Sequence, residues 1–186
     1  MRKILALAVV MSLALAAPAM AAYQKSIGRL FADKPDVKVY VNEVKNESGD
    51  NVATADAFHQ VLISSLMNRR SMHFVIVKDP TKSDIEVSAL ITKFQYMDRG
   101  PLKPSPGVQT TLLDAVATAT ENYVEMTVDF TVTDPKSGKT LWQGDVYDYI
   151  KQVMTPSESA PLIYDRVARR FLWKCFGKPR RGSILM

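Results

Sequence analysis

Few side chains in this sequence have a type and spacing that could support chemistry, and the two histidines come first. His59 falls in a segment with helical spacing, about one residue from its apolar stripe, and His73 begins an expected strand. Zinc sites and general bases need His, Cys or carboxylate partners that converge on one point. Neither histidine has a partner at such a spacing, so we expect both to be edge-of-core residues.

A phosphate-binding loop or a nucleophile is not indicated either. Ser137 to Thr140 reads Ser-Gly-Lys-Thr, the end of a phosphate-binding loop, but Thr133 stands where that loop requires glycine. Such a loop leads from a strand into a helix, whereas this segment joins two expected strands. Cys175 lies on an apolar helical face with no base nearby. We expect it to be buried as a small apolar residue, with an intermolecular disulfide as the alternative.

Four carboxylates surround the same turn, and paired acids can hydrolyse glycosides. They are Asp129, Asp134, Asp145 and Asp148. Asp145 and Asp148 have opposite parity along a strand, so they should face opposite sides of the sheet. We expect these acids to keep the strands soluble, and we predict a non-enzymatic protein without a cofactor or a metal ion.

The sharpest functional candidate is a basic surface on the last expected helix and the tail behind it. Its cations stand beside Phe171, Trp173 and Phe176, although Trp173 could instead belong to the core. Cations mixed with aromatic rings suit an anionic lipid, a lipopolysaccharide or an acidic envelope protein. The alternative is a solvated face whose cations suit the helix C-terminus. The seven candidate binding residues are Arg166, Arg169, Arg170, Lys174, Lys178, Arg180 and Arg181.

The N-terminus has the pattern of an export signal. Arg2 and Lys3 precede an apolar run that is short for a membrane span and that ends in small residues. We assign residues 1–21 to a signal peptide cleaved after Ala21 or Ala22, which predicts a periplasmic protein with no transmembrane segment after cleavage. The only cysteine is far from that site, so we expect no lipidation.

The 186 residues fit one domain with a core of its own. We place a leader at 22–36, a single domain at 37–177 and a basic tail at 178–186. The formal net charge is +5, and it falls to +3 when the two basic residues of the signal peptide are removed. That modest balance does not indicate a nucleic-acid partner.

Alternating and helical patterns define the elements of the first half. Val37 to Val41 alternates as a first strand. A helix follows, with Thr54 as its cap and Asn68 to Arg70 placing positive charge in its last turn. Phe74 to Val77 reads as a short second strand. The leader before these elements is either a docked turn or a mobile arm.

The next strand changes its pattern along its length. Ile85 to Ile91 alternates, but beyond Ala89 the opposite face also becomes apolar, with Leu90, Phe94 and Tyr96. Either a bulge shifts the phase or the strand is covered on both faces there.

The middle of the chain is the hardest to assign. The prolines and glycines between Gly100 and Gly107 predict irregular structure there. Thr110 to Thr120 could be a short helix, an extension of the next strand or a mobile insertion.

A hairpin and a closing helix make up the second half. Val124 to Val132 alternates, Asp134 to Lys139 supplies a turn, and Leu141 to Ile150 returns as an aromatic-rich strand. The closing helix has Ser159 as its cap, with Pro161 in its first turn, and it ends at glycine. One apolar face of the hairpin must be covered by other elements.

This order predicts an α+β fold. We expect a two-layer sandwich in which two helices pack on one face of a mixed, mainly antiparallel sheet, in the order β-α-β-β-β-β-α. The first strand, the helix and the second strand should form a right-handed crossover unit.

The same elements resemble a known group of proteins. The matching segments are Val37–Val41, Asn46–Ser48, Phe74–Val77, Ser83–Ile91 and Asp134–Trp142. From about Val37 to Phe176 the chain resembles small bacterial envelope-assembly proteins of the LptE, CsgG and TolB N-terminal-domain type. The resemblance implies a periplasmic, non-enzymatic protein that partners other envelope components. Most of those proteins carry a lipidated cysteine, which this chain lacks, and Gly107 to Thr120 is too short for a pore-forming hairpin.

We therefore predict a binding or scaffold protein that assists the assembly or export of cell-envelope components. Its expected contact surfaces are an exposed sheet edge that accepts a partner strand and the basic face from Arg166 to Arg181. A homo-oligomer is compatible with this prediction. The alternative is a carrier for an amphipathic envelope lipid or glycolipid, with Leu112 to Ala119 as a lid over an apolar pocket.

Overall fold

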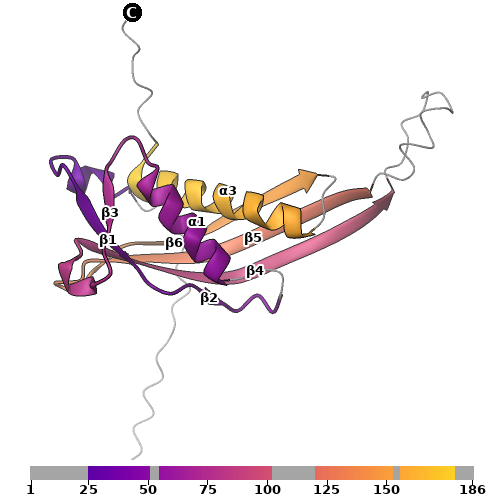
Figure 1. Cartoon of the computed structure of the whole chain (residues 1–186), viewed down its shortest axis with the longest axis horizontal. Helices are drawn as coiled ribbons and strands as arrows, with labels where there is room; N and C mark the ends of the chain where they lie inside the picture. The colour runs from indigo at the N-terminus through magenta and orange to yellow at the C-terminus, as the bar shows by residue number, and fades with distance from the viewer. Residues whose placement is uncertain (1–24, 51–54, 102–119, 153–155, 179–186) are drawn as a thin grey trace, which may run out of the picture.

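The computed structural model describes residues 25–50, 55–101, 120–152 and 156–178. It contains a mixed six-stranded sheet with two α-helices packed against one face (Figure 1). The order β-β-α-β-β-β-β-α confirms the predicted α+β two-layer fold, with one short extra strand, β2 (Lys45–Asn46). The signal peptide, the Thr54 cap, the lid and tail residues Arg180 and Arg181 lie outside the described residues.

The sheet has the strand order β3-β1-β4-β5-β6, and β2 pairs with β4 beside this path. β1 pairs in parallel with both β3 and β4, while β4, β5 and β6 pair antiparallel. β3 and β6 are therefore the two ends of the path. The strands are β1 (Val37–Val41), β3 (Phe74–Ile76), β4 (Ile85–Pro101), β5 (Thr120–Thr133) and β6 (Thr140–Gln152).

The hairpin of β5 and β6 forms as its sequence pattern predicts. Gly138 takes a left-handed φ of 67° in the turn, where its backbone N–H donates to the Asp134 carbonyl oxygen at 2.8 Å. The alternating apolar residues of β5 are fully buried beneath the helices. They are Val124, Met126, Val128, Phe130 and Val132.

A bulge explains the change of pattern in β4. Its register against β5 slips between Ile91 and Lys93, so Thr92 is an extra residue in the strand. Phe94 is thereby turned to the core face, where it is buried. The prediction of irregular structure from Gly100 onward was wrong for the end of this strand, because β4 pairs with β5 as far as Pro101.

The first helix, α1 (Ala55–Met67), ends earlier than the charge pattern predicted. It buries Phe58, Leu62 and Leu66 against the sheet. The last-turn assignment of residues 68–70 was wrong because the Arg69 side chain reaches across to the end of the other helix.

The closing helix, α3 (Pro156–Phe176), begins five residues before Pro161, so the predicted start was also wrong. Pro156 takes the first position, where a missing N–H costs nothing, and Pro161 lies inside the helix. Gly177 ends the helix as expected, with a φ of 87° and its N–H on the Trp173 carbonyl. Phe171 stacks on Phe130 of β5 at a centroid distance of 4.1 Å.

The leader is docked on the body of the protein. The 3-10 helix η1 (Gly28–Phe31) and the residue before it bury the side chains of Ile27 and Phe31. The Ile27 N–H donates to the Cys175 carbonyl at 2.8 Å, at the C-terminal end of α3. Cys175 itself is buried, which raises the pKa of its thiol. The docked turn, not the mobile arm, is therefore the form adopted.

We expect Gly28→Ala to destabilise the protein by about 1–3 kcal/mol, the usual cost of forcing an extra group into a packed site. A Cβ at this position would lie 2.2 Å from the backbone oxygen of Phe176, so the leader or α3 must move. Urea unfolding measures the loss. Leu30→Ala on the same turn is the control, because Leu30 is 63% exposed and should cost little. Equal stability of the two variants would show that the close approach is not a constraint.

Candidate functional site

The two histidines do not come together with acids in a catalytic arrangement. His59 Nε2 lies 3.4 Å from the carbonyl of Val41, the last residue of β1. His73 Nδ1 lies 2.6 Å from the Asp36 carboxylate, and both of these side chains are exposed. Within residues 25–50, 55–101, 120–152 and 156–178, no group of three or more His, Cys, Asp and Glu residues could hold a metal ion.

The four candidate carboxylates separate into three environments. Asp129 and Asp145 are register partners across β5 and β6, on the face away from the helices. Asp134 accepts hydrogen bonds within the hairpin turn. Asp148 faces the other side, as its parity predicted, but it is only 4% exposed. Strand solubility was therefore the wrong role for Asp148, which is buried and ion-paired.

The Asp129 carboxyl group is electrostatically unfavourable where it stands. Partial burial, with the facing charge of Asp145 as a second cause, raises the pKa of Asp129. Like charges directly opposite each other on neighbouring strands destabilise a sheet. This pair therefore destabilises the sheet locally on its open face, the face away from the helices.

A second cluster on the open face buries a carboxylate that the strand pattern placed in solvent. Glu125 is 8% exposed, pairs with Lys93 and accepts a hydrogen bond from the Tyr147 hydroxyl at 3.1 Å. Tyr123 and Tyr149 stack beside it with ring centroids 5.4 Å apart. Hydrogen bonding to Tyr123, together with desolvation and Glu125, raises the pKa of Tyr147. The charged and hydroxyl groups of this cluster therefore have partners within it, and the stacked tyrosine rings lie beside them.

Three of the seven predicted binding cations contact β6. Arg166 and Arg170 pair with Asp148 at 3.2 and 3.3 Å. Arg170 also donates to the Tyr147 carbonyl at 2.8 Å, and Lys174 donates to the Asp145 carbonyl at 2.8 Å. These cations have partners within the chain.

The other predicted cations lie elsewhere. Arg169 pairs with Asp165 one turn earlier on α3, and this hydrogen bond raises the pKa of Arg169. Lys178 is exposed just beyond the helix end. Arg180 and Arg181 fall outside the described residues. The structure therefore divides the predicted basic surface and does not present it as one face.

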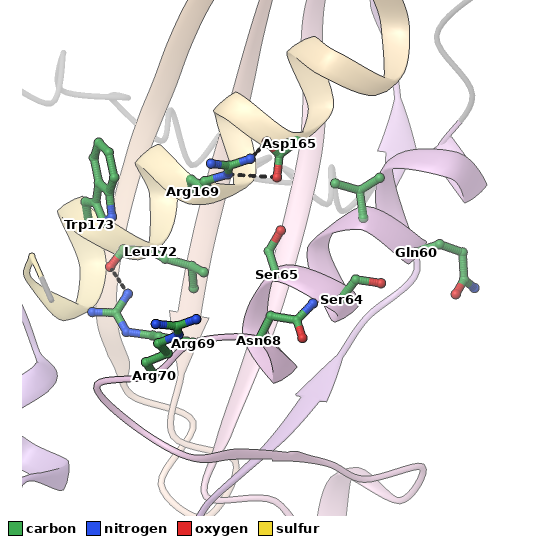
Figure 2. Close-up of a pocket in the computed structure, with 11 residues that line it drawn as sticks. Gln60, Ser64, Ser65, Asn68, Arg69, Arg70, Asp165, Arg169, Leu172 and Trp173 are labelled. Atoms are coloured by element: carbon green, nitrogen blue, oxygen red, sulfur yellow. Dashed lines mark hydrogen bonds and ion pairs between the residues drawn. The ribbon is translucent and has the colours of Figure 1, made fainter.

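The candidate site is a groove of about 690 Å³ between α1 and α3, on the side of the helices away from the sheet (Figure 2). Its apolar part is formed by Val61, Leu172 and Trp173, and Trp173 is 46% exposed. Polar side chains of α1 continue the same surface. The remaining lining residues are Gln60, Ser64, Ser65, Asn68, Arg69, Arg70, Asp165 and Arg169.

Arg69 is the residue that holds the two helices together at one end of the groove. Its guanidinium donates to the Leu172 carbonyl at 2.7 Å (Figure 2). It also donates to the Gly177 carbonyl at 2.5 Å and lies over the ring of Phe176. Burial lowers the pKa of Arg69 without removing its charge. A cation at carbonyls that end a helix is favourable.

The charge around the groove is mainly positive. Arg69, Arg70 and Arg169 contribute three cations against the one carboxylate of Asp165. The sequence did not indicate Arg69 and Arg70 as site residues, because nothing in the chain signals that the loop after α1 lies beside α3. The groove can hold an apolar side chain with a carboxylate beside it, the combination that its walls complement.

No helix in the described part of the chain is long and apolar enough to cross a membrane. The pocket expected beneath residues 112–119 belongs to the lid, which lies outside the described residues.

Comparison with known proteins gives similar structures and no sequence match. No protein-family model matches the chain, and no curated protein matches it. PelC from Paraburkholderia phytofirmans, a dodecamer, is 14% identical with a TM-score of 0.48, covering 83% of this chain and 94% of that one. A lipoprotein from Neisseria meningitidis is 12% identical with a TM-score of 0.42, covering 73% and 97%.

A minor lipoprotein from Acinetobacter baumannii is 12% identical with a TM-score of 0.39, covering 72% of this chain and 87% of that one. At these identities and TM-scores, the similarity assigns no function to this chain. Membership of the LptE, CsgG and TolB group stays a prediction.

We expect Asp129→Asn to raise the midpoint of thermal unfolding at neutral pH. A raised pKa means that the ionised carboxylate is less stable in the folded chain than in the unfolded chain. The wild type therefore loses stability as the pH rises from the ordinary range of an aspartate through the higher folded value. Asparagine does not ionise, so its advantage should disappear near about pH 3. Circular dichroism at both pH values measures the difference.

The control is Asp134→Asn, which should lower the midpoint at neutral pH. Hydrogen bonds from Ser137 and Lys136 lower the pKa of Asp134, so its ionised form stabilises the turn, and that contribution is lost as the pH falls. The same sign for both variants would contradict the assignment.

Proposed function

We propose that this chain is an exported, non-enzymatic binding or scaffold protein that assists the assembly or export of cell-envelope components. It holds a segment of a partner protein in the groove between α1 and α3. The observation that carries the proposal is the half-exposed Trp173 ring on an apolar groove whose rim carries three arginines.

The groove suits a peptide better than a small polar molecule. Exposed Trp and Arg side chains are enriched among the residues that contribute most to protein interfaces. Two helices lying side by side can take an amphipathic helix along the furrow between them. The cations at its rim favour a partner segment whose apolar side chains are flanked by Asp or Glu.

The proposal of a non-enzymatic role rests on where the reactive groups lie. Cys175 is buried near the C-terminal end of α3. His73 pairs with the exposed Asp36 carboxylate, whereas His59 lies beside the Val41 carbonyl. The paired acids on the open face repel each other and are not arranged around the groove. The groove itself offers cations, amides and hydroxyls, which suit binding.

Export to the periplasm is part of the same proposal. It is supported by the signal-peptide pattern of residues 1–21 and by the resemblance to envelope-assembly proteins. An acidic envelope protein is the partner that this compartment and the groove charge together favour. The carrier alternative depends on residues 112–119 and has no support among the described residues.

Photo-crosslinking in cells tests the proposal. A photoreactive amino acid at Arg70 or at Trp173 should capture the same envelope protein, because both positions line the groove. The same group at Leu30 on η1 or at Thr131 on the open face is the matched control, since both lie outside the groove. Capture at the control positions as strong as in the groove would contradict the groove as the docking site.

We expect Trp173→Ala to weaken binding of the captured partner by on the order of 30-fold, the effect of losing about 2 kcal/mol at a central aromatic contact. Arg70→Glu should weaken it further at low salt, and the loss should shrink as salt screens the charge. Isothermal titration calorimetry with the purified partner measures both. Circular dichroism checks that each variant is folded. Unchanged affinity in both variants would remove the groove from the function.

A further inference from the structure

β6 is the last strand on its side of the sheet path, and several of its outward-facing backbone groups already have side-chain partners. The Asp145 carbonyl accepts from Lys174 and the Tyr147 carbonyl accepts from Arg170, both at 2.8 Å. The Tyr149 N–H donates to the Asp148 carboxylate at 2.8 Å. In an antiparallel pair, alternate residues direct their N–H and C=O groups away from the neighbouring strand. Residues 145, 147 and 149 share that alternation.

The match between α3 and this edge follows from helix and strand dimensions. Arg170 and Lys174 are four residues apart, which is a rise of about 6 Å along a helix. The carbonyls of residues 147 and 145 are two residues apart, which is about 6.8 Å along a strand. α3 runs opposite to β6, so the two cations fall in step with the two carbonyls. One helical turn of α3 thus spans about the distance between two successive outward-facing carbonyls of β6.

Asp148 anchors this arrangement. Its carboxylate is buried on the core face, and it binds Arg166, Arg170 and the Tyr149 N–H together. A buried carboxylate is costly unless ion pairs and hydrogen bonds satisfy it. The Asp148 carboxylate is therefore placed to hold the Arg170 side chain against the β6 edge.

We propose that Asp148, Arg170 and Lys174 form a gate that closes the β6 edge against strand pairing with a second copy of this chain. An edge strand with free N–H and C=O groups is a template for another strand, and lysines and arginines are among the groups that block it. With the gate removed, two β6 edges can pair antiparallel. That pairing is two-fold symmetric and closes as a dimer.

The gate changes the meaning of two predicted contact surfaces. The sheet edge and the basic face were expected as separate sites, but along β6 they are one place. Arg170 and Lys174 of the predicted basic face already donate to carbonyls of the predicted sheet edge. This inference does not depend on the α1–α3 groove, since none of the three gate residues lines it.

The test opens the gate without leaving a buried charge unpaired. In the triple variant Asp148→Asn, Arg170→Met, Lys174→Met, the asparagine oxygen still accepts from the Tyr149 N–H, and the methionines keep the apolar contacts. Sedimentation velocity should give a species of twice the wild-type mass, with native near-ultraviolet circular dichroism. Arg169→Met is the matched control, because Arg169 pairs with Asp165 and not with β6. It should keep the wild-type mass.

Adding Asp145→Pro to the triple variant should restore the wild-type mass. Proline removes an outward N–H and its ring blocks the edge. If the triple variant unfolds, Lys174→Met alone serves, since it removes one cap and leaves the Asp148 pairs intact. That single variant should show a dimer that grows with concentration. A folded gate variant that keeps the wild-type mass at every concentration would overturn the proposal, as would a dimer that persists with the proline.

Discussion

The stack of Phe171 on Phe130 is the contact on which the rest of the structure depends. It lies on the face of α3 that meets the sheet, and Trp142 of β6 packs against the same ring edge-on. Once Phe171 points inward, the positions around it on the helix are fixed by the 100° step of an α-helix. Residues 170 and 174 then reach β6, while residues 169, 172 and 173 line the groove.

The end of α3 is fixed by segments from three parts of the chain. The leader contributes the Ile27 N–H, the loop after α1 contributes Arg69, and Gly177 turns the chain out of the helix. The last carbonyls of a helix have no partners within it, so these groups satisfy a need that every helix end has. Of these groups, Arg69 also lines the groove. One side chain therefore serves both the end of α3 and the candidate binding surface.

Positive charge has several tasks in this protein that composition cannot distinguish. Arg69 satisfies a helix end, Arg170 and Lys174 occupy an edge strand, and Arg70 lines the rim of the groove. A run of basic residues on one helix is therefore weak ground for a binding site until the partners of each residue are known. The position of a cation in the sequence pattern did not show which of these tasks it has, because long side chains reach groups that are distant in the chain.

The sequence by itself determined the elements whose patterns are local. Alternation determined β1 and β5, glycine with a positive φ determined the hairpin turn and the end of α3, and the apolar stripe determined the buried face of α1. Tertiary structure alone decided the start of α3, which the pattern at Ser159 and Pro161 placed too late. It also decided between the two explanations of the β4 pattern, because a bulge depends on the register against the neighbouring strand. It also decided the candidate site. Arg69 and Trp173 are 104 positions apart, and only the packing of two helices brings them to one groove.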